Sequence, residues 1–446
     1  MERAIFLTVL HRLFAPGSDR AAEVWREDYA IPGVEGLQLH HLYRAMGWLG
    51  EELPDDDQQA GATPFAPRCV KDRIEELLFA RSRDLFTALE LVFFDTTSIY
   101  FEGEGGETLG HHGHSKDHRP DCKQMVIAVV LDGCGRPVCC ELWPGNTSDV
   151  TTLIPIVDRL KQRFHIHSIC IVADRGMISK DTITQLRAAH RNAHYILGAR
   201  LRSVKEVNRD VLGRAGRYHV VHGPKQHSKA PAPLKVKEVW VENRRYIVCH
   251  NEAQARKDAA DREAILAGLE EKLKQGPAAL VGNRGYRRFM SARPGGVFQI
   301  DAAKVRRDAR FDGKWVLTTD TDLSPTECAL RYKELWMVEQ SFRSFKSVLE
   351  TRPIYHQCDA TIRGHVFCSF LALVLLKELL ARLKQRGWEV EWDRLRANLD
   401  TLEEMTIATS GRAFVVRSDV QGDAGKALQA AGVALGPTIR LTDTPQ

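Results

Sequence analysis

The sequence predicts a mixed α/β fold in which a sheet is flanked by helices. The runs Leu91–Asp95 and Met125–Leu131 are almost wholly apolar, which is typical of strands buried on both faces. Between residues 150 and 199, helix-like and strand-like segments alternate, as they do in layered α/β proteins. With 43% hydrophobic and 27% charged residues, the composition is globular and excludes both wholesale disorder and a fibrous repeat.

Length and cysteine content indicate several domains in a reducing compartment. At about 100–200 residues per domain, 446 residues predict two to four domains. Ten cysteines with no CxxC pair are too few for a disulfide scaffold, so reduced thiols are expected. The longest apolar run, Val366–Leu376, is shorter than the roughly 18–20 residues of a membrane-spanning helix. We therefore expect a cytosolic protein with no membrane partner.

Residues 1–89 predict an N-terminal helical domain, and residues 90–199 predict the first part of an α/β core. Breaks such as Ala15–Gly17 separate the expected helices of the first segment. These helices are Ala4–Phe14, Ser18–Tyr29, His40–Leu49 and Val70–Leu89. The core strands are expected at Leu91–Asp95, Met125–Leu131, Arg136–Trp143, Ser168–Ala173 and Ala193–Ala199, and its helices at Val150–Phe164 and Ser179–His190.

Residues 200–322 form a segment of different character. A hairpin is expected at Val236–Val241 and Arg245–His250, a charged helix at Asp258–Gln275 and a strand at Lys314–Thr319. Between residues 200 and 250, twelve basic residues stand against four acidic ones, whereas the whole chain carries only +5. Concentrated positive charge suits contact with a phosphate backbone. A solvated loop region is the alternative interpretation.

The remaining residues predict long helices and a tail. Residues 323–390 contain a long helical pattern, Glu327–Leu349, and a strongly apolar one, Thr361–Arg386. Residues 391–446 form a C-terminal tail punctuated by Gly, Asp and Thr.

Acidic residues at strand ends are the first candidates for a functional site. Asp95 and Asp174 each follow an almost wholly apolar strand, and carboxylates on adjacent strands suit a hard divalent cation such as Mg²⁺. A turn former or helix cap explains either residue alone equally well.

The long helical pattern supplies a third acid, Glu339. On a continuous helix it would share one stripe with four neighbours spaced by 3, 4, 4 and 3 residues. The stripe consists of Tyr332, Leu335, Glu339, Arg343 and Lys346. From spacing alone, an ordinary salt-bridged exposed face explains it.

Five motifs occur in order along the chain: Phe94–Gly103, Gly113–Asp121, Trp143–Asp149, Val172–Met177 and Tyr332–His356. Together they resemble the bacterial insertion-sequence transposases of the DDE class. The nearest resemblance is to the insertion-sequence-four superfamily and its YREK signature, Tyr-x2-Arg-x3-Glu-x6-Lys. Tyr332, Glu339 and Lys346 match that register, whereas Leu335 stands in place of the arginine, so a cationic phosphate contact is absent there or comes from Arg343.

The resemblance implies an RNase H-like mixed sheet flanked by helices, in which residues 200–322 are a β-rich insertion. It implies that Asp95, Asp174 and Glu339 are the catalytic residues and hold two Mg²⁺ ions, with Mn²⁺ as a possible substitute. Two such ions would activate a water molecule and then a 3′-hydroxyl in DNA phosphoryl transfer. Tyr332, Arg343 and Lys346 would contact phosphate. Trp315 is a candidate for stacking on a flipped base, with a place in the hydrophobic core as the alternative.

The resemblance also implies the partners. They are double-stranded DNA, as the terminal inverted repeats of the element and as target, and a second copy of the chain in a synaptic homodimer. Such proteins work in the bacterial cytoplasm at the nucleoid. Relatives often carry an additional segment before the helical region, so we expect a shorter variant or a truncated reading frame, and recognition of the element ends is affected accordingly.

Three other interpretations stay open. His111, His112, His114, His118 and Cys122 are zinc-type ligands, but their spacing matches no standard zinc finger. A related nuclease would cut DNA without joining it. An inactive DNA-binding remnant would bind element ends and repress transposition.

Overall fold

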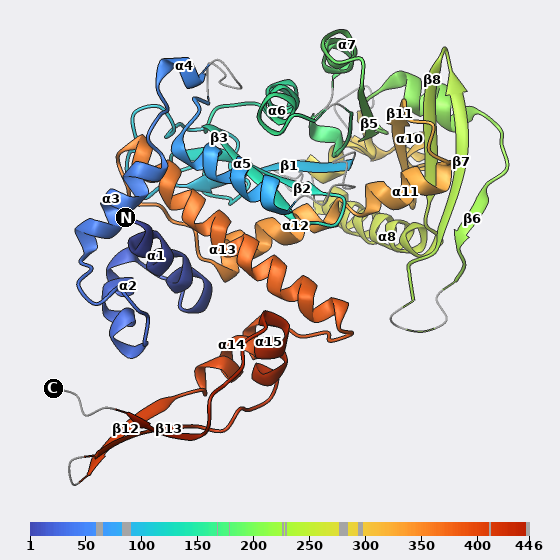
Figure 1. Ribbon diagram of the computed structural model, residues 1–446. Helices are drawn as coiled ribbons and strands as arrows, with labels where there is room; N and C mark the ends of the chain where they lie inside the picture. Colours follow the sequence, from blue (N-terminus) through green and yellow to red (C-terminus); the bar gives the residue numbers. More distant parts are fainter. Residues whose placement is uncertain are drawn as a thin grey trace.

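The computed structural model describes residues 1–58, 66–82, 91–166, 168–177, 179–224, 227, 230–275, 284–292, 298–409 and 412–442. At its centre lies a nine-stranded sheet with helices on both faces (Figure 1). This is the mixed α/β architecture that the apolar strand patterns predicted.

The sheet has the strand order β3-β2-β1-β4-β5-β11-β8-β7-β6. The strands are β1 (Leu91–Tyr100), β2 (Gln124–Asp132), β3 (Pro137–Pro144), β4 (Ile169–Ala173), β5 (Ala193–Gly198), β6 (His219–His222), β7 (Leu234–Val241), β8 (Arg244–His250) and β11 (Lys314–Thr319). β1, β2 and β3 are antiparallel neighbours, whereas β1, β4 and β5 run parallel. This mixed five-stranded unit is the RNase H-like arrangement that was expected.

The basic segment extends the same sheet. β11 pairs with β5 on one side and β8 on the other, and β7 and β6 follow outward. The expected hairpin, helix and strand all form, and the helix begins earlier than predicted. Besides its strands, the segment contains η3 (Glu206–Val211), α8 (Glu252–Gln275), α9 (Arg284–Arg287), β9 (Met290–Ala292), β10 (Phe298–Ile300) and α10 (Ala302–Ala309).

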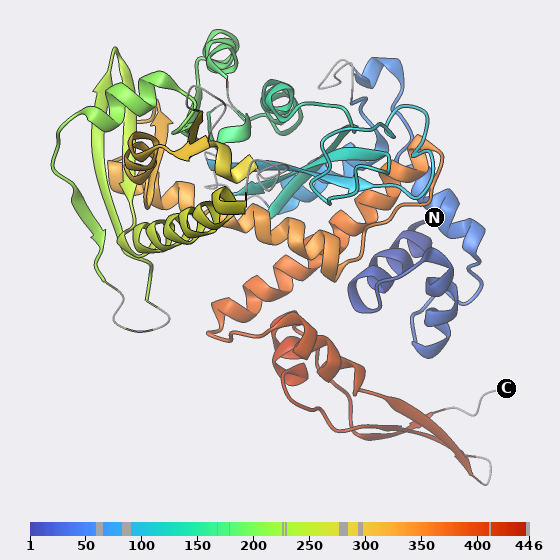
Figure 2. The same cartoon turned by 180° about the vertical axis from the view of Figure 1, so that it is seen from behind.

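Helices from different parts of the chain cover the two faces of the sheet (Figures 1 and 2). α6 (Asp149–Phe164), the short turn η2 (Arg175–Met177) and α7 (Lys180–Ala189) lie on one face. α11 (Pro325–Lys333), α12 (Trp336–Arg343) and α13 (Asp359–Gln385) lie on the other, which we call the α12 face. Ser324 caps α11 in a reciprocal hydrogen-bonded box with Glu327, as the sequence Ser-Pro-x-Glu favours.

The N-terminal helices pack on α13 and on the sheet. They are α1 (Glu2–Phe14), α2 (Asp19–Trp25), η1 (Arg26–Asp28), α3 (Leu39–Leu49), α4 (Asp55–Gln58) and α5 (Val70–Ser82). α1 and α3 contact α13. α4 lies between the helices predicted at His40–Leu49 and Val70–Leu89, and residues 83–89 of the latter lie outside the described residues.

The helix predicted at Glu327–Leu349 is interrupted, and the single stripe predicted on it is therefore wrong. Between α11 and α12 the backbone tightens to i→i−3 hydrogen bonds, including Leu335 N–H to the carbonyl of Tyr332. After α12, Ser344–Val348 (η5) form a wider π-helical turn. Both irregularities change the rotation per residue, so side chains at helical spacing no longer share one face.

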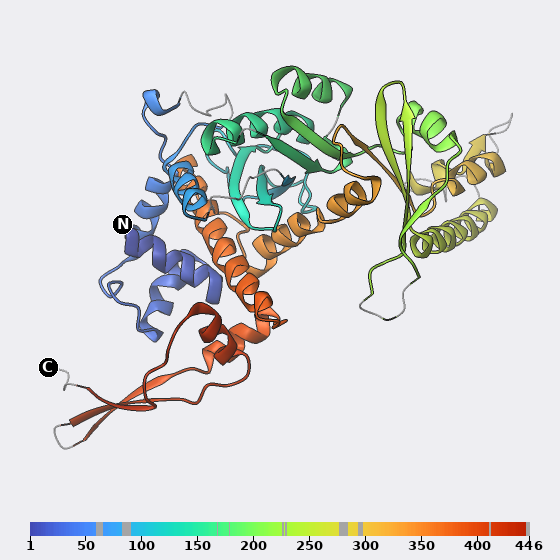
Figure 3. The same cartoon turned by 45° about the vertical axis from the view of Figure 1, so that its right-hand side comes forward.

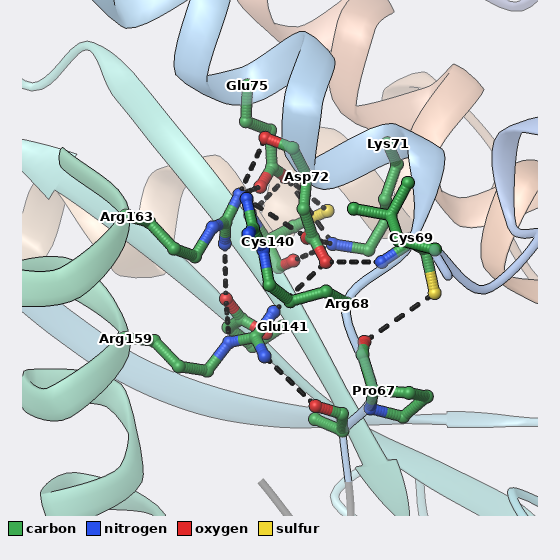
Figure 4. A network of polar contacts seen from close by, with 12 residues as sticks. Pro67, Arg68, Cys69, Lys71, Asp72, Glu75, Cys140, Glu141, Arg159 and Arg163 are labelled. Carbon is green, nitrogen blue, oxygen red and sulfur yellow. Dashed lines mark hydrogen bonds and ion pairs between the residues drawn. The ribbon is translucent and has the colours of Figure 1, made fainter. Parts of the chain in front are cut away.

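A buried ionic network attaches α5 to the sheet and to α6 (Figure 4). Asp72 and Glu75 of α5 meet Glu141 of β3 and two arginines of α6. Arg163 contacts Glu75 at 2.5 Å and Glu141 at 2.8 Å, and Arg159 contacts Asp72 at 3.1 Å. Because every member is buried, the charges stabilise the structure only as a complete set.

The C-terminal residues form a separate small layer. It comprises α14 (Trp392–Asp400), α15 (Ala424–Ala431), β12 (Glu404–Thr409), β13 (Arg412–Arg417) and β14 (Ile439–Thr442). The strands make a three-stranded sheet that projects from the body of the molecule (Figure 3). All ten cysteines are free thiols. No helix within the described residues is both long and apolar enough to cross a bilayer.

Candidate active site

Parallel pairing of β1 and β4 places Asp95 next to Asp174. Phe94 pairs with Ala173, so the two aspartates follow on neighbouring strands whose backbones lie about 4.8 Å apart in such a ladder. β4 ends at Ala173, whereas β1 continues to Tyr100 against β2. The prediction that Asp95 closes its strand is therefore wrong. Asp95 lies within β1, where that strand loses one of its two partners.

Both carboxylates belong to the α12 face. Phe93 and Val172, two residues earlier on each strand, belong to the core on that face, and side chains alternate along a strand. Tyr332 of α11 donates a hydrogen bond of 2.8 Å to Oδ1 of Asp174. Burial, together with the charge of Asp174, raises the pKa of the Tyr332 phenol. The residue predicted to contact phosphate thus contacts a predicted catalytic carboxylate.

Asp95 lies in a largely buried and acidic environment. Its pKa is raised to about 6, mainly by burial and also by the negative charges of Asp174 and Asp149. Lys116 and a 2.7 Å hydrogen bond from the backbone N–H of Thr96 oppose this rise. Ionisation of Asp95 is therefore less favourable in the folded protein than in the unfolded chain, and a cation bound at the carboxylates would offset that cost.

Lys116 and Asp149 are neighbours of Asp95 to which sequence reasoning assigned no role. The ammonium of Lys116 lies 3.1 Å from Oδ2 of Asp149 and 2.7 Å from the carbonyl oxygen of Thr96. Asp149, the first residue of α6, accepts a 2.6 Å hydrogen bond from the Thr96 hydroxyl. Lys116 lies in the motif Gly113–Asp121 and Asp149 in the motif Trp143–Asp149. Their contact with β1 depends on the tertiary structure, which the motifs do not specify.

The third predicted acid, Glu339, lies on α12, and the ligand oxygens of Glu339, Asp95 and Asp174 do not all lie within 4.8 Å of one another. Leu335, Val338 and Phe342 of this segment are buried in the core of the α12 face. Glu339 and Arg343 are exposed, and neither side chain has a hydrogen bond or ion pair within the described part of the chain. The salt-bridged face that was the alternative interpretation therefore does not form.

Lys346 has an acidic partner. Its ammonium lies 2.7 Å from Oδ1 of Asp117, and Arg352 contacts the same oxygen at 2.6 Å. Burial lowers the pKa of Lys346, and Asp117 opposes that shift. To contact a phosphate, Lys346 would therefore have to bind it together with Asp117 or give up its ion pair with Asp117.

Trp315 lines a cavity of about 730 Å³ together with Asp174 and Tyr332. Its indole N–H is buried and has no hydrogen-bond partner among the described residues, and the ammonium of Lys333 lies 5.8 Å from the ring centroid. The ring also packs against the main core. Trp315 thus packs partly against the hydrophobic core and borders the cavity, and its stacking on a flipped base stays a prediction.

The positive charge predicted for residues 200–250 is partly neutralised. Several of its cations pair with acids inside or beyond the segment, namely Arg209 with Asp210, Arg244 with Glu206, Arg245 with Glu238, Lys235 with Glu252 and Arg202 with Asp308. Lys205, Arg214 and Arg217 have no carboxylate partner among the described residues. Lys225 and Lys229 lie outside the described residues.

The oxygen ligands of Asp95 and Asp174 fit Mg²⁺, but the predicted trio with Glu339 is not a compact set. Among the residues that the structure describes, one group of three possible metal ligands has all its ligand atoms within 4.8 Å of one another. It consists of Asp19, His356 and His365.

That compact set already contains a cation. The guanidinium of Arg12 lies 3.2 Å from Asp19 and 2.9 Å from Nδ1 of His365. Because its positive charge would repel a metal ion, we do not assign a metal site there.

Comparison with known proteins identifies a family. Residues 87–375, more than half of the chain, match the model described as "Transposase DDE domain". Among solved structures, the piggyBac transposase synaptic complex with hairpin DNA has 11% identity and a TM-score of 0.36, covering 89% of this chain and 79% of that one. The Mos1 transposase paired-end complex with left transposon end has 14% identity and a TM-score of 0.18, covering 43% and 57%. No curated protein matches the sequence.

Proposed function

Since the chain belongs to the family of transposases with a DDE domain, we propose that it is the transposase of a bacterial insertion sequence of the insertion-sequence-four superfamily. Its reaction would be cleavage of DNA at the element ends, followed by joining of those ends to target DNA. The match of Tyr332, Glu339 and Lys346 to the YREK register supports the superfamily assignment, and Leu335 departs from it.

The observation that carries the proposal is the pair of carboxylates on adjacent strands. Asp95 and Asp174 offer hard oxygen ligands on one face of the sheet, and burial raises the pKa of Asp95 in spite of the nearby positive charge of Lys116. We propose that these two residues, with Glu339 from α12, hold two Mg²⁺ ions, which Mn²⁺ could replace. When bound, such ions activate the attacking oxygen and stabilise the leaving oxygen of phosphoryl transfer.

The other side chains have proposed roles in holding and positioning. The hydrogen bond from Tyr332 would fix the orientation of Asp174, and the phenol also borders the cavity in which a phosphate could lie. Arg343 on α12 has no acidic partner among the described residues, and Lys346 lies further along the same segment, so both are proposed phosphate contacts. Trp315, at the cavity edge, is the proposed stacking partner of a flipped base.

We further propose that the partners are the terminal inverted repeats, the target DNA and a second copy of the chain in the synaptic complex, in the bacterial cytoplasm. The division of the chain at residues 89, 199, 322 and 390 remains a proposal. In it, residues 200–322 are an insertion in the catalytic core that contacts DNA through cations such as Lys205, Arg214 and Arg217.

The test is cleavage of DNA carrying the element ends in Mg²⁺. Asp95→Asn, Asp174→Asn and Glu339→Gln should each abolish cleavage and leave end binding largely intact, because the substitutions remove a metal ligand at nearly constant size. Glu334→Gln, at a half-buried position on the turn between α11 and α12 where it pairs only locally with Arg331, is the matched control and should cleave normally.

The outcomes separate the alternatives. Normal cleavage by any of the three variants contradicts the assignment of that residue. Cutting by the wild-type protein without joined products would identify a nuclease. Binding without cleavage in either Mg²⁺ or Mn²⁺ would identify an inactive remnant.

A further inference from the structure

A second cavity, of about 610 Å³, lies next to the candidate active site. Its described lining comes from η2, α7, β5, β8, β11 and the residues from 199 to 207. It lies on the side of the sheet opposite the α12 face, where α7 and η3 cover neighbouring strands (Figure 3). Arg175, Arg200 and Ser203 line both this cavity and the one of about 730 Å³ beside Asp174. A volume of this size is typical of a pocket for a small organic ligand.

Positive charge dominates the second cavity. Among the described residues, four arginines line it, and a single carboxylate, that of Glu206, opposes them. The arginines, after which we call it the arginine cavity, are Arg175, Arg187, Arg200 and Arg244. The described lining of the neighbouring cavity instead has five carboxylates and five cations. Because three positive charges are in excess, the arginine cavity attracts an anion and repels a metal ion.

Arg175 and Arg200 keep their charge available for a ligand. The guanidinium of Arg200 donates hydrogen bonds of 3.2 and 3.4 Å to the backbone carbonyls of Arg175 and Gly176. These neutral acceptors orient the side chain and do not neutralise it. The side chain of Arg175 has no carboxylate partner among the residues that the structure describes. Both guanidiniums can therefore bind an anion without first breaking an ion pair.

The other two arginines come from different elements. Arg187 of α7 donates a 2.9 Å hydrogen bond to the hydroxyl of Tyr195, and its Nε lies 3.8 Å from a carboxylate oxygen of Asp320. Arg244, the first residue of β8, forms a 2.9 Å ion pair with Glu206. A guanidinium has five N–H donors, so the contacts of Arg187 leave several of them for a ligand. Arg244 is largely neutralised by its own partner.

The rest of the wall is apolar and comes from two hydrophobic clusters. Ile183 packs against the cluster under α6 and α7, whereas Val204 and Val207 belong to the cluster of residues 200–322. The nearly buried rings of Tyr195 and Tyr246 complete this wall. An apolar wall beside guanidiniums fits an anion that carries a flat organic group better than it fits an inorganic ion.

We propose that the arginine cavity binds a nucleoside 5′-monophosphate, with the phosphate at the guanidiniums and the base against the apolar wall. The planar fork of arginine matches two oxygens of a phosphate group. A phosphate monoester carries about −1.5 to −2 charge at pH 7, whereas a phosphodiester within a DNA strand carries a single negative charge. The monoester therefore complements the excess of positive charge better.

Two sources supply such a group. One is a free nucleotide. The other, which rests on the proposed function, is the 5′ end of a cut DNA strand. In that cut, water forms a bond to phosphorus, the bond from phosphorus to the 3′ oxygen breaks, and a proton from water goes to that oxygen, so the phosphate stays on the 5′ side. Since both cavities share Arg175 and Arg200, this end would arise beside the arginine cavity.

The test is calorimetric titration of the full chain, without DNA or divalent metal, with each of the four 2′-deoxynucleoside 5′-monophosphates. At least one should bind in the micromolar range, and its nucleoside and inorganic phosphate should each bind at least about ten-fold more weakly. Arg187→Gln should weaken nucleotide binding at least about ten-fold, because it removes a charged donor from this cavity alone. Arg191→Gln, an exposed position that lines neither cavity, should bind like the wild type.

Thermal unfolding of both variants checks that they are folded, since Arg187 and Arg191 are exposed. The proposal is overturned if no nucleotide binds saturably, if inorganic phosphate binds as tightly, or if Arg187→Gln binds like the wild type. No cleavage is measured, so these results are independent of whether the chain proves to be a transposase.

Competition by a single-stranded oligonucleotide distinguishes the two sources. Displacement of the nucleotide by a 5′-phosphorylated strand, and not by the same strand with a 5′-hydroxyl, identifies a DNA end as the ligand. Displacement by neither strand identifies a free nucleotide, and both of these results uphold the site. Equal displacement by the two strands would show that the terminal phosphate is not recognised, which contradicts the proposal.

Discussion

Asp95 shows how a single residue can be held in a state that the folded chain alone disfavours. Its pKa is raised to about 6, so folding favours the protonated form, and stability falls as pH rises from 3.8 through 6. The ionised carboxylate of Asp95 at neutral pH therefore lowers the stability of the folded protein, as perturbed groups at functional sites often do.

We predict that Asp95→Asn makes the metal-free protein more stable at pH 7. A shift of two units corresponds to about 2.7 kcal/mol at most, so a gain on the order of 1–3 kcal/mol is expected. Denaturant unfolding without divalent ions measures it. Asp393→Asn, at an exposed position on α14, should change stability by less than about 0.5 kcal/mol. If Asp95→Asn is no more stable than the wild type at pH 7, ionisation of Asp95 does not destabilise the folded protein.

The same pKa predicts the pH dependence of metal binding. Above pH 6 the Asp95 carboxylate is ionised and can bind Mg²⁺, whereas below pH 6 a proton competes with the ion. Thermal stabilisation by Mg²⁺ should therefore be strong at pH 7.5 and weaken progressively through pH 6 toward pH 5. Stabilisation that is equal at pH 5 and 7.5 would show that Asp95 is not a ligand.

Among the elements, α5 depends on partners far away in the sequence. Its mean hydropathy is low, and its buried side includes Lys71, Asp72 and Glu75, which no amphipathic pattern would place in a core. The helix is held because Arg159 and Arg163 of α6 and Glu141 of β3 complete the ionic network.

We predict that Arg163→Met costs about 3–5 kcal/mol of stability, because it leaves Asp72, Glu75 and Glu141 buried with less compensating charge. Denaturant unfolding measures the loss. Arg73→Met, which breaks the exposed pair with Asp57, should cost less than about 1 kcal/mol. Similar losses in the two variants would mean that the network contributes no more than a surface pair.

At the scale of the whole molecule, one polar cluster connects the first helices to α13. Arg12 of α1 contacts Asp19 of α2 and the backbone and side chain of His365 in α13. Burial lowers the pKa of His365, and it lowers that of neighbouring His11 to about 4. Both histidines are therefore neutral in the folded protein at pH values where the unfolded chain is protonated, so acid weakens this connection.

We predict that amide exchange in α1 accelerates as pH falls from 6.5 to 5, after correction for the intrinsic pH dependence of exchange. The unfolded state binds protons below pH 6.5 that the folded histidines do not accept. His365→Asn should flatten this dependence, leaving the part due to His11. Substitution of His40, which is exposed on α3, should not change it. If the pH dependence of amide exchange in α1 is the same in His365→Asn as in the wild type, this cluster is not its cause.

The sequence by itself determined the mixed α/β class, the positions of β2, β4 and β5 to within about a residue, and the two aspartates next to apolar strands. Continuous apolar runs and their boundaries are local properties, which is why they could be predicted. The five motifs also predicted the family that residues 87–375 show.

Tertiary structure alone decided the rest. It extended β1 past Asp95, because β2 offers a partner as far as Tyr100. It broke the helix after α11, paired Lys346 with Asp117 and placed Lys116 next to Asp95. Each of these depends on contacts between residues far apart in the chain, and local periodicity contains no information about which distant residue becomes the neighbour.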